Sequence, residues 1–145
     1  MFKGEFSHTI DSKGRMIIPA KMREQLGETC VVTRYFDNTL AIYTQEKFDE
    51  IAKKLSSQSS NKANQRGLVR FFVGGAADLD FDKQGRVLIP SNLRAHGELK
   101  KDVVVVGNGE RIEIWSKTRW EAYNNEIYSN IEAMAEELDL DDIGF

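Results

Sequence analysis

The chain has little of the chemistry on which secreted and membrane proteins depend. Its 145 residues include one cysteine, Cys30, so no disulfide can form within the chain, which is typical of a reducing compartment. No apolar run approaches the roughly 18 residues that a membrane-spanning helix needs. The first segment, MFKGEFSHTI, lacks the apolar core of a signal peptide. We therefore expect a soluble, cytoplasmic protein without a membrane partner.

Residues suited to metal binding and nucleophilic catalysis are also scarce. His8 and His96 are far apart, Cys30 has no motif around it, and neither a P-loop nor a G-x-G-x-x-G sequence is present. Asp11 and Asp82 each precede an arginine by four residues, which favours the ionised carboxylate and argues against acid catalysis. The sequence therefore predicts no enzyme, no metal, no cofactor and no small-molecule substrate.

Basic residues are absent from the end of the chain. All 20 lysines and arginines lie in residues 1–120, together with 15 of the 23 aspartates and glutamates. Residues 121–145 contain acidic residues but no basic ones. The formal net charge of −3 thus averages a mildly basic body and an acidic tail, and it does not exclude a nucleic-acid partner.

What the chain does contain is an internal repeat. The segment DSKGRMIIP at 11–19 returns as DKQGRVLIP at 82–90, an offset of 71 residues. Such self-similarity predicts two copies of one structural unit. Met22-Arg23 matches Leu93-Arg94 at the same offset. After one extra residue in the second copy, Ala41-Ile42-Tyr43 matches Glu113-Ile114-Trp115.

Each copy predicts a hairpin, a short helix, a second hairpin and a longer helix. GEFSHTI and AADLDF alternate apolar and polar residues, as half-buried strands do. Asp11 with Gly14, and Asp82 with Gly85, are the first and fourth residues of type I turns whose glycine opens a bulged hairpin. The returning strands, MII and VLI, are apolar on consecutive residues, so we expect both of their faces to be covered. A proline ends each strand and suits the first turn of a short helix.

The remaining patterns complete the two units. Thr44 and Ser116 are expected to cap the longer helices, and SSQSSN predicts a break between the halves. An apolar stripe on the last helix is expected to pack on the core: Trp120, Tyr123, Ile127, Ile131, Met134 and Leu138. The predicted organisation is repeat 1 at 5–51, linker helices at 52–75, repeat 2 at 76–123, and a C-terminal helix with an acidic tail at 124–145.

One such repeat has too little apolar area to fold unaided, because domains of about 40 residues usually need further support. Two interlocked copies would share one core. We therefore predict a mainly β protein with helices (α+β), in which a pseudo-twofold axis brings Arg15 and Arg86 to one face.

These features resemble the MraZ family, bacterial proteins with two Asp-x-x-x-Arg motifs, and more widely the SpoVT/AbrB-like DNA-binding domains. The resemblance covers nearly the whole chain and rests on the MFKGE start, DSKGR at 11–15, DKQGR at 82–86 and IEIW at 112–115. It implies two tandem SpoVT/AbrB-like repeats that form a pseudo-twofold swapped-hairpin β-barrel. It also implies a ring of several chains, a homo-oligomer that regulates transcription in the nucleoid. The expected partner is double-stranded DNA with short repeated boxes, upstream of its own gene in the division and cell wall gene cluster.

The paired motif supplies the candidate DNA contacts. A guanidinium can meet a phosphate or the O6/N7 edge of guanine in bidentate fashion, and a lysine in the turn can reach the DNA backbone. A carboxylate beside phosphates is repelled, so the aspartates are expected to orient the arginines or cap the turns. We predict DNA contact by Arg15, Arg86, Lys13 and Lys83, with motif support from Asp11, Gly14, Asp82 and Gly85.

Other interpretations stay open at this point. Each Asp–Arg pair could instead be a local ion pair that locks its hairpin, and for Arg23 and Arg94 a structural salt bridge is expected rather than DNA contact. A purely protein-binding role, such as that of an antitoxin, usually requires a long disordered tail, whereas residues 116–138 predict an amphipathic helix. About four cations per chain would bind DNA weakly at physiological salt, which favours several chains acting together.

Overall fold

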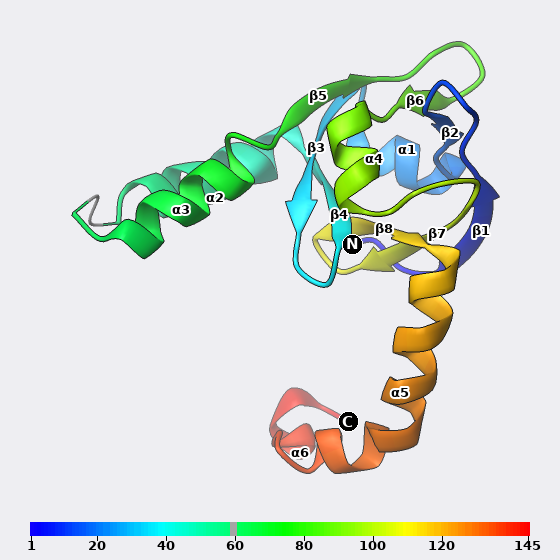
Figure 1. Cartoon of the computed structure of the whole chain (residues 1–145). Helices are drawn as coiled ribbons and strands as arrows, with labels where there is room; N and C mark the ends of the chain where they lie inside the picture. Colours follow the sequence, from blue (N-terminus) through cyan, green and yellow to red (C-terminus); the bar gives the residue numbers. More distant parts are fainter. Residues whose placement is uncertain (59–60) are drawn as a thin grey trace.

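The computed structural model (Figure 1) describes residues 1–58 and 61–145. Residues 59 and 60 belong to the serine-rich stretch in which a break was predicted, so that part of the prediction lies outside the described residues. The first half contains β1 (Glu5–Thr9), β2 (Arg15–Ile17), α1 (Ala20–Leu26), β3 (Thr29–Tyr35), β4 (Thr39–Thr44) and α2 (Gln45–Ser56). The second contains α3 (Ala63–Phe72), β5 (Ala77–Asp80), β6 (Arg86–Leu88), α4 (Ser91–His96), β7 (Asp102–Asn108), β8 (Arg111–Ser116), α5 (Lys117–Ala135) and α6 (Leu140–Ile143).

The main sheet is symmetric about its centre. Its strand order is β1-β7-β8-β4-β3-β5, and exchanging every strand with its counterpart in the other half reproduces the same order. Strand β1 of the first half pairs with β7 of the second, and β5 of the second half pairs with β3 of the first. The hairpins are therefore swapped between the halves, and the predicted mainly β fold with helices is confirmed.

Two residue pairs mark the pseudo-twofold axis. Ala41 of β4 lies opposite Glu113 of β8 in the main sheet, and Met16 of β2 lies opposite Val87 of β6 in a separate two-stranded ribbon. Each pair joins positions that are equivalent in the sequence repeat. The axis that relates the halves therefore passes between the members of both pairs.

The described strands do not close into the expected barrel. Strands β2 and β6 pair with each other, which leaves β1 and β5 as the two edges of an open six-stranded sheet. A single bridge between Ile10 and Met16 continues the pairing of β1 towards β2. Strands β2 and β6 each have three residues and form their ladder with each other, apart from both edges of the described sheet. This ribbon crosses over the sheet as a separate layer.

The hydrophobic core fills the space between the ribbon and the main sheet. Met16 and Val87 point inward and are each 1% exposed, and they join one cluster with side chains of the sheet such as Val32 and Ile112. Helices α1 and α4 follow the prolines that end the ribbon strands; α1 contributes Met22 and Leu26 to the cluster, and α4 contributes Leu93. Burial of each aliphatic side chain stabilises the fold by about 1.5–3 kcal/mol. Both halves therefore depend on one shared core.

The outer face of the ribbon is uncovered, so the prediction that both strand faces are covered is wrong. Ile17 is 43% exposed and Leu88 is 56% exposed, although their neighbours in sequence are fully buried. The residues of the apolar runs MII and VLI thus lie on two different faces of the ribbon, one facing the core and one facing solvent. Alternate residues enter the core, and the residues between them face outward.

The longer helices extend from the body (Figure 1). Their predicted caps are confirmed: Thr44 accepts a hydrogen bond from the Lys47 N–H at 3.1 Å, and Ser116 accepts one from the Arg119 N–H at 3.4 Å. Helices α2 and α3 lie side by side, and no residue of α2, α3 or α5 is fully buried.

Only the start of the predicted apolar stripe on α5 packs on the body: Trp120 and Tyr123 contact the buried Trp115, at 5.2 and 4.9 Å between ring centroids. Further along the helix the prediction is wrong, because α5 leaves the body and Ile131 and Met134 are exposed. Among the helices of the described residues, none has the length and apolar character needed to cross a membrane.

Candidate nucleic-acid interface

The first Asp-x-x-x-Arg motif folds into a turn that holds its own arginine. Asp11 Oδ1 accepts hydrogen bonds from the backbone N–H groups of Lys13 and Arg15, each at 2.9 Å. Asp11 Oδ2 accepts a third from Arg15 Nε, also at 2.9 Å. The Gly14 N–H donates to the Asp11 carbonyl at 3.0 Å, and Gly14 has φ 95°, which favours glycine. The carboxylate therefore organises the turn and orients the arginine.

The second motif repeats this geometry. Asp82 Oδ1 accepts from the backbone N–H groups of Gln84 and Arg86 at 2.9 Å, and Oδ2 accepts from Arg86 Nε at 2.8 Å. Gly85 has φ 77°. The lysines are exposed in both turns but stand at different positions, since Lys83 directly follows its aspartate and Lys13 follows one residue later.

Hydrogen bonding keeps the motif carboxylates ionised. The pKa of Asp11 falls from 3.8 to about 2, mainly because the Arg15 backbone N–H donates to the carboxylate. Burial opposes this change, and the Arg15 side chain supports it. The pKa of Asp82 is lowered for the same leading reason, the hydrogen bond from the Arg86 backbone. Each arginine therefore faces a negative partner at neutral pH.

The ion pair leaves most of each guanidinium free. Only Nε of Arg15 and Arg86 contacts the motif aspartate, and the described residues offer no hydrogen-bond partner to the terminal Nη groups. The two side chains are 37% and 29% exposed. A guanidinium held at Nε presents its Nη groups in a fixed direction, which suits a phosphate or a guanine edge. The ion-pair interpretation and the DNA-contact interpretation are thus compatible.

The register of β2 and β6 places both arginines on one face. Arg15 lies opposite Leu88, and Ile17 lies opposite Arg86. Since side chains alternate between faces along a strand, these four residues share the face that points away from the buried pair at the axis. We call this surface the ribbon face: Arg15, Ile17, Arg86 and Leu88. The arginines are diagonal neighbours, about 7–8 Å apart between Cα atoms, and Figure 1 shows both turns at the same end of the molecule.

A second pair of arginines, not assigned to the interface from sequence, lies beside the turns. Arg23 of α1 lies against Gly85, and Arg94 of α4 lies against Gly14, so each reaches the turn of the other half. The predicted salt bridges are not found among the described residues, and Nε of each arginine is buried without a hydrogen-bond partner. In the sequence, only the equivalent positions of Arg23 and Arg94 in the two repeats indicated that these arginines have a shared role beside the turns.

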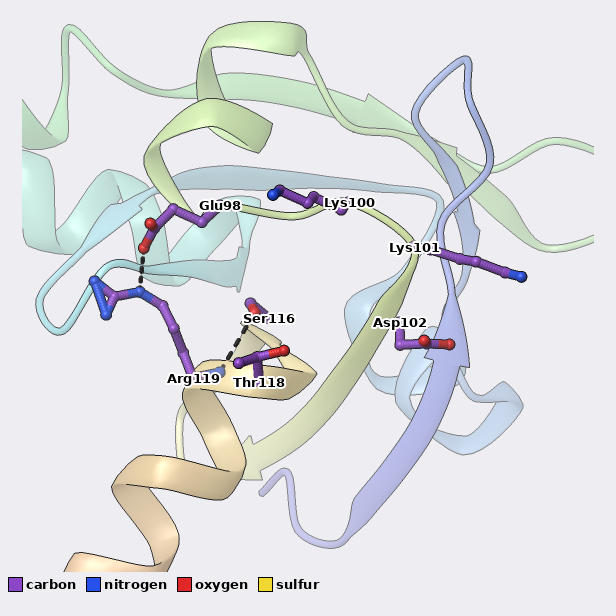
Figure 2. Close-up of a pocket in the computed structure, with 7 residues that line it drawn as sticks. All are labelled: Glu98, Lys100, Lys101, Asp102, Ser116, Thr118 and Arg119. Atoms are coloured by element: carbon purple, nitrogen blue, oxygen red, sulfur yellow. Dashed lines mark hydrogen bonds and ion pairs between the residues drawn. The ribbon is translucent and has the colours of Figure 1, made fainter.

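A pocket at the start of α5 is an alternative candidate site (Figure 2). Arg119 pairs there with Glu98 and also donates to Asn38 Oδ1 at 2.9 Å, while Ser116 is occupied as the helix cap. The pocket is lined by charges of both signs, including Lys100, Lys101 and Asp102, and neither motif contributes to it. Across the described part of the chain, no three His, Cys, Asp or Glu side chains are grouped to hold a metal ion. The ribbon face and its turns therefore remain the best candidate site.

Known proteins resemble this chain over nearly its full length. The family model for the MraZ protein, described as antitoxin-like, matches residues 1–71 and again residues 72–142. The transcriptional regulator MraZ of Desulforamulus reducens is 48% identical over 138 residues, which is 95% of this chain and 97% of that protein. The transcriptional regulators MraZ of Moorella thermoacetica and Pediococcus pentosaceus are each 49% identical over 138 residues, 95% of this chain and 96% of each relative. The resemblance inferred from the paired motifs is confirmed, and the chain belongs to the MraZ family.

Proposed function

We propose that this protein is a DNA-binding transcriptional regulator whose ribbon face and turns contact a single duplex. Relatives of nearly the same length are named transcriptional regulators. The observation that carries the proposal is the position of Arg15 and Arg86 on one face, each with free Nη groups. A two-stranded ribbon has dimensions that the major groove admits.

The motif residues have two roles: some, called readers here, contact DNA directly, and the others hold these residues in position. Arg15 and Arg86 contact a phosphate or a guanine edge, and a bidentate contact of this kind is worth about 1–3 kcal/mol of discrimination. Lys13 and Lys83 contact the phosphate backbone as point charges. The supporting residues hold the readers in place through the hydrogen bonds and turns described above: Asp11, Gly14, Asp82 and Gly85.

We also propose that several chains act together as a ring on short repeated boxes upstream of the gene that encodes the protein. About four cations give a single chain only weak affinity at physiological salt, because affinity falls with each counterion released. Linked chains raise the effective concentration at neighbouring boxes. Helix α5 offers a surface for a neighbouring copy, since its apolar residues Ile131 and Met134 are 50% and 42% exposed. Such a ring would be located at the nucleoid.

A competition binding experiment tests the proposal. Duplex DNA from upstream of the gene should displace a labelled repeat-containing duplex when bulk DNA does not. Arg15→Ala should abolish this specific binding and leave the native particle mass unchanged, because Arg15 is part of the exposed turn. Lys54→Ala, which removes a cation from α2, is the matched control and should bind like the wild type. Failure of upstream DNA and of short repeats to compete over bulk DNA contradicts the proposal.

Arg15→Ala could also lose DNA binding because the variant does not fold. That result would show that the Asp11–Arg15 ion pair serves mainly to stabilise the hairpin. Circular dichroism of the variant therefore accompanies the binding measurement.

A further inference from the structure

The ribbon face presents two aliphatic side chains as well as two arginines. Ile17 lies opposite Arg86 and Leu88 lies opposite Arg15, so the arginines occupy one diagonal of the face and the aliphatic residues occupy the other. The aliphatic pair flanks the pseudo-twofold axis, because Met16 and Val87 stand between them on the opposite face. Both are large apolar residues at the centre of the candidate interface.

The fold itself does not require these side chains. The core beneath the ribbon is filled by Met16 and Val87, each 1% exposed, whereas Ile17 and Leu88 keep 43% and 56% of their surface in solvent. Substitutions at exposed positions away from special backbone conformations usually change stability little. Folding therefore does not explain why both repeats place a large aliphatic residue at this position.

The charges around the aliphatic pair indicate what can cover it. Arg15 and Arg86 are beside the pair with unpartnered Nη groups, and the turns that carry Lys13 and Lys83 lie at the same end. An apolar protein surface or a lipid would strip water from these guanidinium groups without replacing their hydrogen bonds, which is costly. The major groove offers the required combination, since it has anionic walls and acceptors next to the C5-methyl group of thymine.

We propose that Ile17 and Leu88 contact thymine methyl groups in the major groove, on base pairs adjacent to those that Arg15 and Arg86 contact. This inference rests on the proposed DNA-binding function and adds a specificity element to it. Opposite residues of an antiparallel pair have Cβ atoms about 4.5–5.5 Å apart, and successive base pairs rise by about 3.4 Å. An arginine and the aliphatic residue opposite it can therefore reach neighbouring base pairs. The pseudo-twofold axis repeats this contact on its other side.

Removal of single methyl groups from the DNA tests the proposal. The probe is the duplex that the wild-type chain selects from a random-sequence library, resynthesised with deoxyuridine in place of thymine at one position at a time. Deoxyuridine differs from thymidine only in lacking the methyl group. At the contacted positions we expect binding to weaken roughly 3- to 5-fold per methyl, the value of one buried CH₂ group. The effect should be absent at the other thymines.

Variants of the chain assign the methyl effect to the two residues. In Ile17→Ser/Leu88→Ser, thymine and deoxyuridine duplexes should bind equally, whereas Ile17→Val should keep the dependence on the methyl group. Leu68→Ser, which alters an exposed apolar residue on α3, is the control and should also keep it. Circular dichroism of each variant should match the wild type.

Two outcomes would overturn this inference while the proposed function stands. The wild type could bind thymine and deoxyuridine duplexes equally even though Arg15→Ala abolishes specific binding. Alternatively, Ile17→Ser/Leu88→Ser could change the native particle mass and leave the methyl dependence intact, which would assign the ribbon face to a second copy of the chain. Failure to select any sequence, or wild-type binding by Arg15→Ala, would instead contradict the proposed function itself.

Discussion

Gly14 lies directly against Ile89 of the other half. The Ile89 N–H donates a hydrogen bond to the Gly14 carbonyl at 2.8 Å, and a Cβ placed on Gly14 would stand 2.7 Å from the Ile89 carbonyl oxygen. The second half forms the reciprocal contact, in which the Ile18 N–H donates to the Gly85 carbonyl at 3.4 Å. The two turns are therefore joined to the strands of the opposite repeat.

Gly14→Ala should destabilise the fold more than Gly109→Ala does. Both glycines have positive φ, 95° and 73°, so both substitutions incur the left-handed cost of about 1–2 kcal/mol. A Cβ on Gly109 would come no closer than 3.8 Å to the Met1 side chain, whereas one on Gly14 meets backbone that cannot move freely. Overpacking should add about 1–3 kcal/mol at Gly14. Equal free energies of unfolding in urea for the two variants would show that the turn is not closely packed on the other repeat.

The first Asp-x-x-x-Arg turn should weaken in acid. The folded pKa of Asp11, about 2, lies below its ordinary value of 3.8, so the carboxylate stabilises the fold above about pH 4 and this contribution is lost as the pH falls towards 2. The difference in unfolding free energy between the wild type and Asp11→Asn should be constant from pH 7 to about 4 and then shrink. Asp141→Asn removes the same charge from the tail and controls for net charge. A difference that does not change below pH 4 would contradict the assigned hydrogen bonds.

Local features of the sequence predicted the elements of the fold correctly. The turns are determined by residues within five positions of one another, as in the Asp11 and Gly14 pair, and the caps at Thr44 and Ser116 involve neighbours three residues away. The equivalence of the repeats predicted that Arg15 and Arg86 share one face. These relationships either are short-range or follow from symmetry alone.

Long-range relationships were not available from the sequence. The apolar character of Ile17 does not indicate whether another segment of the chain packs over it. The periodicity of the strands likewise does not determine whether the edge strands pair to close a barrel. The contact of Arg23 with Gly85 depends on which half supplies the neighbouring turn, and the composition of the helix gave no indication of this. Each error thus concerns a surface formed by segments that are distant in the chain.

Cys30 should not react with thiol reagents in the native protein. The thiol is 0% exposed, and burial raises its pKa to about 12, with Asp80 and Asp78 contributing. The reactive thiolate is therefore scarce and inaccessible at neutral pH. A disulfide-exchange reagent should modify the chain stoichiometrically in denaturant and negligibly without it. Fast labelling of the native protein would show that the sheet around β3 opens readily.

Lys13→Ala should weaken DNA binding similarly on all sequences. A phosphate contact carries no base information, and its loss should reduce the slope of log affinity against log salt by about one. Lys54→Ala, on α2, should leave the slope unchanged. A change in sequence preference without a change in slope would assign Lys13 to a base instead of the backbone.

The central claim is that both turns of one chain face the same duplex, and site-directed photo-cross-linking tests it most directly. Ser12→Cys and Gln84→Cys place thiols on the two exposed turns without removing a lysine, and Cys30 is buried and will not compete for the label. With a photoreactive group on either thiol, we predict cross-links of comparable yield to one and the same selected duplex. Cross-linking from only one turn, or from neither, while the chain remains bound would contradict the account.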